Sequence, residues 1–198
     1  MDPTVDNQLM QKVRDGDAAQ LSVLFERHHK LLFNFFLRLT GTRELSEDLV
    51  QEVFLRMLKY RHTYRADSQF KAWMYQIARN AHVDSFRKVN QELLFEEGEE
   101  NPRNEPISQK PIPDQALQQK QEVTLLRQAL AKLPREKREV LVLSRFQDLK
   151  YEEIAEILAC DVGTVKVRVF RAVRELAEIF LRISRERKLP KMGCAGSR

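Results

Sequence analysis

The amino-acid sequence predicts an all-α fold: two small helical domains joined by a flexible, acidic and proline-rich linker, with a helix-turn-helix in the C-terminal domain. On both sides of a central break, apolar residues recur at intervals of three and four, the spacing of amphipathic helices. The break contains Glu96-Glu97-Gly98-Glu99-Glu100, followed by four prolines and almost no apolar side chains. With 198 residues, 42% of them hydrophobic, the chain can build two cores. We expect domains at 1–90 and 116–183, a linker at 91–115 and a tail at 184–198.

The first domain is expected to contain four helices. Gly16 ends the first of them, and Asp17 then caps a long helix that Gly41 stops. Ser68 can cap the fourth helix. Residues 62–67, before that cap, are polar and aromatic without a helical period, which predicts a loop. The expected helices cover about 8–13, 17–40, 45–60 and 69–88.

The second domain is also expected to contain four helices. Helical periodicity returns after Asp114, and Pro134 ends the first helix and opens the second. The third and fourth helices are predicted over 151–158 and 163–179. From Ser184 onward we expect a frayed tail.

Charge divides the chain into the same three parts. Residues 1–90 carry 14 basic and 11 acidic side chains, 91–115 carry 2 and 7, and 116–198 carry 18 and 11. The net charges are therefore +3, −5 and +7. Two basic domains suggest binding to a polyanion, because Lys and Arg gain affinity by displacing phosphate counterions. On charge alone, an ordinary solvated surface explains the pattern equally well.

Several function classes find no support in the sequence. No apolar run approaches the roughly 20 residues that cross a bilayer, and the polar N-terminus is unlike a secretory signal. We therefore expect a cytoplasmic protein without direct membrane insertion. Cys160 and Cys194 are expected to be free thiols, and the four histidines lack metal-ligand spacing. Without a phosphate-binding loop or a nucleophile beside a base, we expect neither a cofactor nor enzymatic activity.

The most specific local pattern is a helix-turn-helix, with the turn at 159–162 between two helical segments. Helical spacing directs a core stripe inward: Val165, Val169, Ala172, Val173 and Leu176. It directs a mixed basic and apolar set outward: Thr164, Lys166, Val167, Arg168, Arg171 and Arg174. Lys and Arg can bond the acceptors of guanine, and Thr or Val methyl groups can pack on thymine. A solvated basic helix is the alternative interpretation.

Two surfaces of the first domain are further candidates. One side of the helix over 69–88 mixes cations and aromatic rings: Lys71, Tyr75, Arg79, His82 and Phe86. That mixture suits single-stranded or distorted DNA, although amphipathic helices with a few surface aromatics are common. In the helix over 45–60, Leu55 lies beside Gln51 and Glu52, an apolar residue in an acidic patch. Such a face can dock a protein, and a solvated face is an equal alternative.

Four segments, in order, resemble the signature motifs of extracytoplasmic-function sigma factors, the promoter-recognition subunits of bacterial RNA polymerase. They are 48–54 (DLVQEVF), 70–80 (FKAWMYQIARN), 133–138 (LPREKR), and 151–155 (YEEIA) continuing to 162–166 (VGTVK). The resemblance spans about residues 15–176.

The resemblance implies a transcription initiation factor whose partners are core RNA polymerase, promoter DNA and an anti-sigma factor. It implies polymerase binding by Asp48, Gln51, Glu52 and Leu55. The minus-ten element would be read as melted strand, with a flipped base held by the loop from Tyr64 to Gln69 and by Asn80. The residues implied there are Tyr64, Arg65, Asp67, Ser68, Lys71, Tyr75, Arg79, Asn80, Arg87 and Lys88. The minus-thirty-five element would be read as duplex by Thr164, Lys166, Val167, Arg168, Arg171 and Arg174.

Three positions depart from the family's usual pattern. Lys150 stands where a helix-capping Ser is usual, with Asp148 as the nearest substitute cap. Asp161 replaces a common Pro, and Val167 replaces a common Ser. Promoter preference is therefore the least transferable property.

The main alternative is a stand-alone helix-turn-helix regulator. It would need a dimer interface or an effector pocket, and the first domain shows neither clearly.

Overall fold

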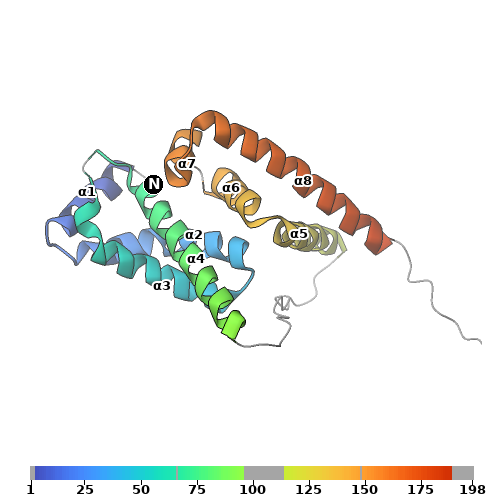
Figure 1. The fold of residues 1–198 in the computed structure, drawn as a ribbon, viewed down its shortest axis with the longest axis horizontal. Helices are drawn as coiled ribbons and strands as arrows, with labels where there is room; N and C mark the ends of the chain where they lie inside the picture. The colour runs from blue at the N-terminus through green and yellow to red at the C-terminus, as the bar shows by residue number, and fades with distance from the viewer. Residues whose placement is uncertain (1–2, 66, 96–113, 148, 189–198) are drawn as a thin grey trace, which may run out of the picture.

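The computed structural model describes residues 3–65, 67–95, 114–147 and 149–188. Within these ranges every regular element is a helix, which confirms the predicted all-α class. Helices α1–α4 form one lobe and α5–α8 form a second lobe beside it (Figure 1). Most of the predicted linker, and Cys194 in the predicted tail, lie outside the described residues. None of the helices described is both long enough and apolar enough to cross a membrane.

The first lobe follows the predicted order of helices. Gly41 ends α2 in the left-handed conformation, with φ 77°, and its N–H donates to the carbonyl of Leu37 at 3.0 Å. Helix α4 continues into the predicted linker, past its predicted end at residue 88. The elements are α1 (Pro3–Arg14), α2 (Gln20–Thr40), α3 (Arg43–Lys59), the short 3-10 turn η1 (Arg61–Thr63) and α4 (Phe70–Phe95).

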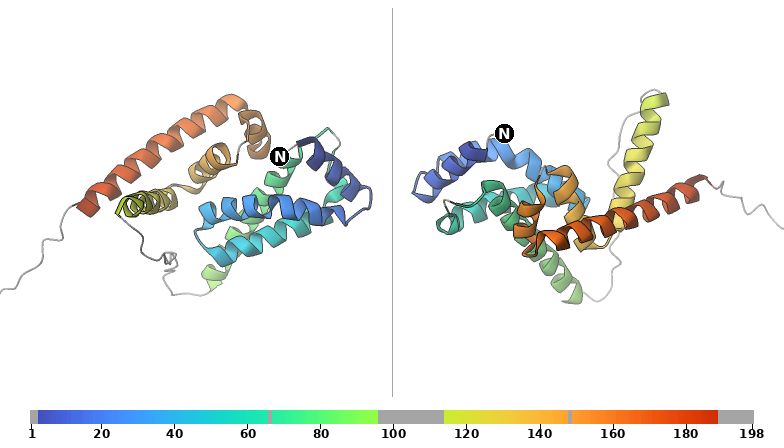
Figure 2. Two further views of the ribbon diagram at one scale, coloured as in Figure 1. Left: turned by 180° about the vertical axis from the view of Figure 1, so that it is seen from behind. Right: turned by 90° about the horizontal axis from the view of Figure 1, so that it is seen from above.

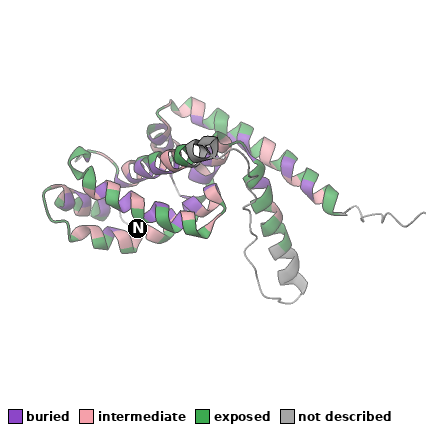
Figure 3. Cartoon of the chain, turned by 60° about the horizontal axis from the view of Figure 1, so that its bottom comes forward, coloured by how far each residue is buried: buried purple, intermediate pink, exposed green. Residues whose placement is uncertain are grey.

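Aromatic side chains fill the core of the first lobe. Phe35 and Tyr75 meet edge to face with their ring centroids 5.2 Å apart, and Phe25 meets Phe54 in the same way at 4.9 Å. Burying one such side chain fully contributes about 1.5–3 kcal/mol. Figure 3 shows the buried residues as stripes on the inward sides of the helices.

The second lobe pairs a long helix with three shorter ones. Its elements are α5 (Asp114–Lys132), α6 (Arg135–Phe146), α7 (Tyr151–Leu158) and α8 (Val162–Lys188). Helix α8 packs on α5, α6 and α7, and α5 and α8 splay apart toward their free ends (Figure 2). The predicted start of fraying at Ser184 is too early, because α8 stays helical to Lys188. Ile183, near the end of α8, is only 8% exposed, which is one reason the helix persists there.

The turn of the helix-turn-helix is stabilised locally at both ends. Ala159 adopts the left-handed conformation, with φ 50°, and ends α7. Asp161 caps α8: its Oδ1 accepts from the Thr164 N–H at 2.7 Å, and its Oδ2 accepts from the Thr164 hydroxyl at 2.5 Å. At the start of α7, the Lys150 N–H donates to Glu153 Oε2 at 2.7 Å. Asp148, the predicted substitute cap, lies outside the described residues.

The two lobes pack directly against each other, α2 and α4 of the first against α6 and α7 of the second. The Tyr75 hydroxyl donates to Gln147 Oε1 at 2.5 Å. Arg138 Nη1 donates to the Leu39 carbonyl at 2.7 Å, near the C-terminus of α2. These two hydrogen bonds link the lobes through polar groups.

We expect Arg138→Met to loosen the contact between the lobes. The variant keeps a long apolar stem but leaves the Leu39 carbonyl without this donor, and an unsatisfied buried acceptor costs about 1–3 kcal/mol. Small-angle X-ray scattering should give a larger radius of gyration, and proteases should cut the linker faster. Arg145→Met, at an exposed position of the same helix, is the matched control. Equal radii for the two variants would contradict the expectation.

We expect Asp161→Ala to lower the melting temperature of the second lobe, because Thr164 loses its capping partner. Hydrogen bonds from the Thr164 hydroxyl and backbone lower the pKa of Asp161 below its ordinary 3.8. The cap therefore contributes stability above that pH, and the contribution is lost as the pH falls through the lowered pKa.

Circular dichroism melts of wild type and Asp161→Ala at several pH values test this. The difference in melting temperature should shrink toward acid pH. Asp161→Asn keeps an acceptor and should retain most of the wild-type value at neutral pH. A difference that is the same at every pH would contradict the role of the ionised cap.

Candidate nucleic-acid interface

The outer face of α8 is basic and exposed, as predicted. Lys166, Val167, Arg168 and Arg171 are exposed, whereas Val165, Val169 and Ala172 are buried. Thr164 is half-buried, and its hydroxyl donates to Asp161. The Arg174 Nε lies 3.2 Å from Glu178 Oε1, so part of its charge is neutralised.

One residue of this face was not predicted from the sequence, and another residue predicted to be buried is exposed. Phe170 is 70% exposed and lies one turn from both Lys166 and Arg174. Its position next to the buried Val169 was a signal that it points away from the core. Val173, predicted to be buried, is 40% exposed. Val173 lies four residues from Val169, but the buried stripe continues through its neighbour Ala172, which leaves Val173 at the edge of that stripe.

The outer face of α3 gathers the residues that the sequence grouped. Asp48, Gln51 and Leu55 are exposed, with Leu55 at 64%. Glu52 is half-buried, and Arg56 Nε donates to its Oε1 at 2.6 Å. Arg56 Nη1 also donates to Asp84 of α4 at 2.7 Å, so Arg56 ties this face to the helix behind it. The surface is an exposed leucine inside an acidic and polar patch.

The loop between η1 and α4 is exposed at its tip and buried at its start. Arg65 and Asp67 are exposed and form an ion pair at 3.1 Å. Ser68 is half-buried. Tyr64 is only 2% exposed, and its ring packs edge to face on Trp73 with centroids 5.2 Å apart. Burial raises the pKa of Tyr64 to about 12, so its hydroxyl stays protonated. The buried ring, packed on Trp73, supports the start of the loop.

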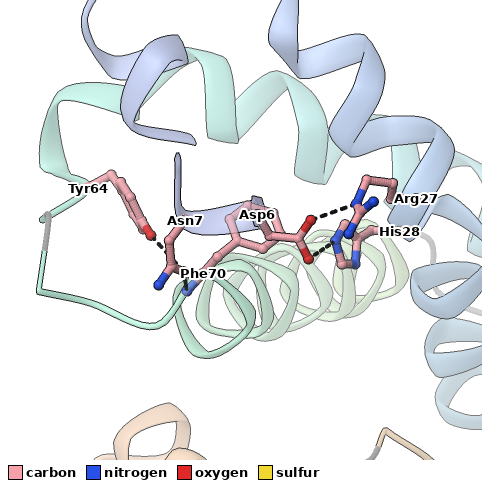
Figure 4. A network of polar contacts seen from close by, with 6 residues as sticks. All are labelled: Asp6, Asn7, Arg27, His28, Tyr64 and Phe70. Carbon is pink, nitrogen blue, oxygen red and sulfur yellow. Dashed lines mark hydrogen bonds and ion pairs between the residues drawn. The ribbon is translucent and has the colours of Figure 1, made fainter. Parts of the chain in front are cut away.

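A residue of α1 caps α4, where the sequence predicted Ser68. Asn7 Oδ1 accepts from the Phe70 N–H at 2.9 Å and from the Tyr64 hydroxyl at 3.2 Å (Figure 4). Beside it, the buried Asp6 accepts from Arg27 Nε at 2.7 Å. Nothing in the local sequence signals these contacts, because Asn7 and Phe70 are 63 residues apart.

The predicted cation and aromatic stripe of α4 lies mostly beneath the second lobe. Tyr75 is 1% exposed and His82 is 7% exposed. Arg79 is half-buried, and its Nε lies 3.2 Å from Glu139 Oε1 of α6. Only Phe86 is well exposed in this stripe, with the Arg135 guanidinium 5.2 Å from its ring centroid. The second lobe therefore shields the aromatic part of this stripe from water.

The remaining predicted residues of α4 are accessible in this arrangement. Asn80, Arg87 and Lys88 are exposed, and Lys71 is half-buried. Asn80 lies nearly three helical turns beyond Phe70, so the loop and Asn80 occupy different levels of the helix.

Burial shifts the titration of the groups between the lobes. Burial raises the pKa of the Glu139 carboxyl, and the positive charge of Arg79 opposes that shift. Burial, followed by the charges of Arg135 and Arg138, lowers the pKa of His82 to about 4. His82 is therefore neutral at neutral pH. Arg79 Nε and Glu139 Oε1 are close but lack hydrogen-bond alignment, so the pair only partly offsets its desolvation.

Comparison with known proteins places both lobes in one family. Residues 24–92 match the family model described as Sigma-70 region 2, and residues 124–176 match Sigma-70, region 4. The chain is 30% identical to RNA polymerase sigma factor YlaC of Bacillus subtilis, over 84% of this chain and 95% of that protein. It is 34% identical to ECF RNA polymerase sigma factor EcfG of Rhodopseudomonas palustris, over 73% and 76% of the two chains.

Solved structures with the same fold are similar over most of the chain. The sigma factor RpoE of Bartonella quintana, in complex with the anti-sigma factor NepR, matches with a TM-score of 0.66 and 26% identity, over 81% of this chain and 96% of that chain. CnrH, in complex with the cytosolic domain of CnrY, shares the fold with a TM-score of 0.67 and 21% identity, over 89% and 97%. These matches give no support to a stand-alone regulator. The chain belongs to the extracytoplasmic-function sigma factors of RNA polymerase, transcription initiation factors that bind the core enzyme and direct it to promoters.

Proposed function

We propose that the two lobes read two separate promoter elements, with the second lobe contacting the minus-thirty-five element as duplex DNA. The observation that carries this is the exposed outer face of α8, where Lys166, Arg168 and Arg171 surround the apolar Val167 and Phe170. A helix with such a face fits the major groove. Arginine and lysine bond guanine acceptors there, and apolar side chains contact thymine methyl groups.

The remaining members of this set position the helix. Thr164 donates its N–H and its hydroxyl to Asp161, and these bonds fix the start of α8. Arg174 is exposed at the edge of this face and can exchange its ion pair with Glu178 for a phosphate contact.

We propose that the first lobe binds the minus-ten element as a melted strand. The exposed tip of the loop, with Arg65 and Asp67, provides polar contacts to an unstacked base. The exposed Asn80, nearly three turns farther along α4, provides a polar contact to another part of the melted strand. Arg87 and Lys88 provide charges for the backbone farther along α4. Tyr64 acts indirectly, as the buried support of the loop.

Two residues of the proposed minus-ten surface depend on movement of the second lobe. Tyr75 and Arg79 contact Gln147 and Glu139, and they can meet DNA only after the lobes separate. Lys71, half-buried at the start of the same stripe, is already accessible in this arrangement. The arrangement described here therefore withholds part of the proposed DNA surface.

The outer face of α3 is the proposed docking surface for core RNA polymerase. Leu55 supplies the apolar centre, and Asp48, Gln51 and Glu52 supply the polar surround. This composition, an apolar anchor with a polar rim, is that of a protein interface.

We also propose that an anti-sigma factor holds this chain with its lobes together. The similar structure from Bartonella quintana is that of a sigma factor in complex with an anti-sigma factor. A partner that binds the protein while its lobes are in contact would keep Tyr75 and Arg79 covered by the second lobe. The protein would act by binding alone, without catalysis, in the cytoplasm where promoter DNA is found.

In vitro transcription with core polymerase, on promoters selected by the wild type, tests the proposed function. Arg171→Ala should lower specific transcription about tenfold or more, because one good base contact contributes about 1–3 kcal/mol. Arg182→Ala, an exposed arginine farther along α8, should leave transcription unchanged. Equal activity of Arg171→Ala and wild type would contradict the role of α8 in promoter recognition. Tight duplex binding without core polymerase, and no initiation with it, would contradict the proposal as a whole.

Leu55→Glu should weaken binding to core polymerase, because it places a charge where the docking face needs an apolar anchor. We expect the dissociation constant to rise at least about tenfold, the loss typical of a central interface residue. Biolayer interferometry with immobilised core enzyme measures it. Val23→Glu, an exposed apolar residue on α2 that is 43% exposed, is the matched control. Equal effects of the two variants would contradict the assignment of α3.

A further inference from the structure

Helix α1 is bonded to the loop that precedes α4 by the side chain of Asn7. Asn7 Oδ1 accepts from the hydroxyl of Tyr64, at the start of the loop, and from the N–H of Phe70, the first residue of α4. One carboxamide oxygen therefore connects both ends of the loop (Figure 4). Between these ends, Arg65 and Asp67 project into solvent.

Among the described residues of the loop, 64, 65 and 67–69, the other hydrogen bonds are local. Within the loop, the Ser68 N–H donates to the Arg65 carbonyl at 3.0 Å, and the Tyr64 hydroxyl also lies 3.2 Å from the Ser68 carbonyl. The N–H groups at the start of a helix require acceptors, and at Phe70 that acceptor comes from α1. Without Asn7 the Phe70 N–H would need water or a rearranged loop to satisfy it.

Asn7 is itself held in place by its neighbour on α1. Asp6 is 2% exposed; its Oδ1 accepts from Arg27 Nε at 2.7 Å, and its Oδ2 lies 2.9 Å from His28 Nε2, a fully buried ring of α2. The His28 ring in turn lies 5.0 Å from the ring of Phe70. These contacts fix α1 against α2 and α4, so the acceptor of Asn7 cannot easily withdraw.

We propose that Asn7 is a positioning residue for minus-ten recognition, and that α1 braces the loop so that its exposed tip is preshaped to receive an unstacked base. This inference rests on the proposed role of the loop. Asn7 acts through Tyr64 and Phe70, and it does not itself touch DNA. A preshaped loop avoids the ordering cost that a flexible loop would incur on binding.

The test is transcription by holoenzyme from two series of templates, made from a promoter selected by the wild-type protein. One series carries single-base changes in the minus-ten element, and the other carries them in the minus-thirty-five element. Asn7→Ala should reduce discrimination within the minus-ten series about tenfold, as expected for the loss of one or two hydrogen bonds. It should leave discrimination within the minus-thirty-five series unchanged. Asn7→Asp keeps the acceptor, at a helix N-terminus that favours negative charge, and should restore discrimination.

Matched variants separate positioning from mere stability. Gln8→Ala, exposed on the same helix, should match the wild type. Tyr64→Phe keeps the ring on Trp73 and removes only the hydroxyl, so it should reproduce part of the Asn7→Ala effect even if Asn7→Ala folds poorly. Weaker transcription from every template alike, following a lower melting temperature, would overturn the inference and leave Asn7 a structural residue.

Asn80→Ala and Arg65→Ala distinguish this inference from the proposed function beneath it. If these two variants reduce minus-ten discrimination and Asn7→Ala does not, the inference fails and the proposed role of the loop stands. If none of the three changes minus-ten discrimination, the proposed role of the loop fails and the inference fails with it.

Discussion

Tyr75 joins the two lobes, because its ring belongs to the core of the first lobe while its hydroxyl bonds the second. The ring packs on Phe35 of α2, and the hydroxyl donates to Gln147 just beyond α6. Helix α4 is thereby packed on two sides, by α3 and α1 within its own lobe and by α7 across the lobe boundary. A helix with apolar and aromatic side chains on two faces cannot leave both in water without a large cost.

The two sides of α4 differ in chemistry. The difference suits the separation of the lobes that the proposed function requires. Toward its own lobe, α4 contributes apolar residues such as Met74 and Ala78, both fully buried. Toward the second lobe it contributes Tyr75, Arg79 and His82. Charged groups at that boundary lose hydration when the lobes close, as the raised pKa of Glu139 and the lowered pKa of His82 indicate. Interfaces of this polar kind favour relative movement of domains, whereas the apolar core of the first lobe does not.

While the lobes are in contact, two of the three proposed surfaces are exposed and the third is covered. The outer faces of α3 and α8 are exposed whether or not the lobes touch, as Leu55 and Phe170 show. The stripe on α4 is covered, and the loop beside it is held by α1. In the proposed function, polymerase and duplex DNA can therefore be approached first. The melted strand gains its full surface only when the polar contact between the lobes is exchanged for contacts with polymerase and DNA.

The sequence by itself determined the order of the helices and the outer face of α8, because these depend on local periodicity and on nearby capping residues. Gly41 ends α2 as predicted, and Val165, Val169 and Ala172 are buried as their spacing indicated. Only the tertiary structure decided that Tyr75 and His82 face the second lobe, and that Asn7, far away in the chain, caps α4 in place of Ser68. The physical reason is that periodicity tells which side of a helix is apolar but not what covers its polar side. A tyrosine or histidine buried against another domain has the same spacing as one in solvent, and a cap supplied from a distant helix leaves no local pattern at all.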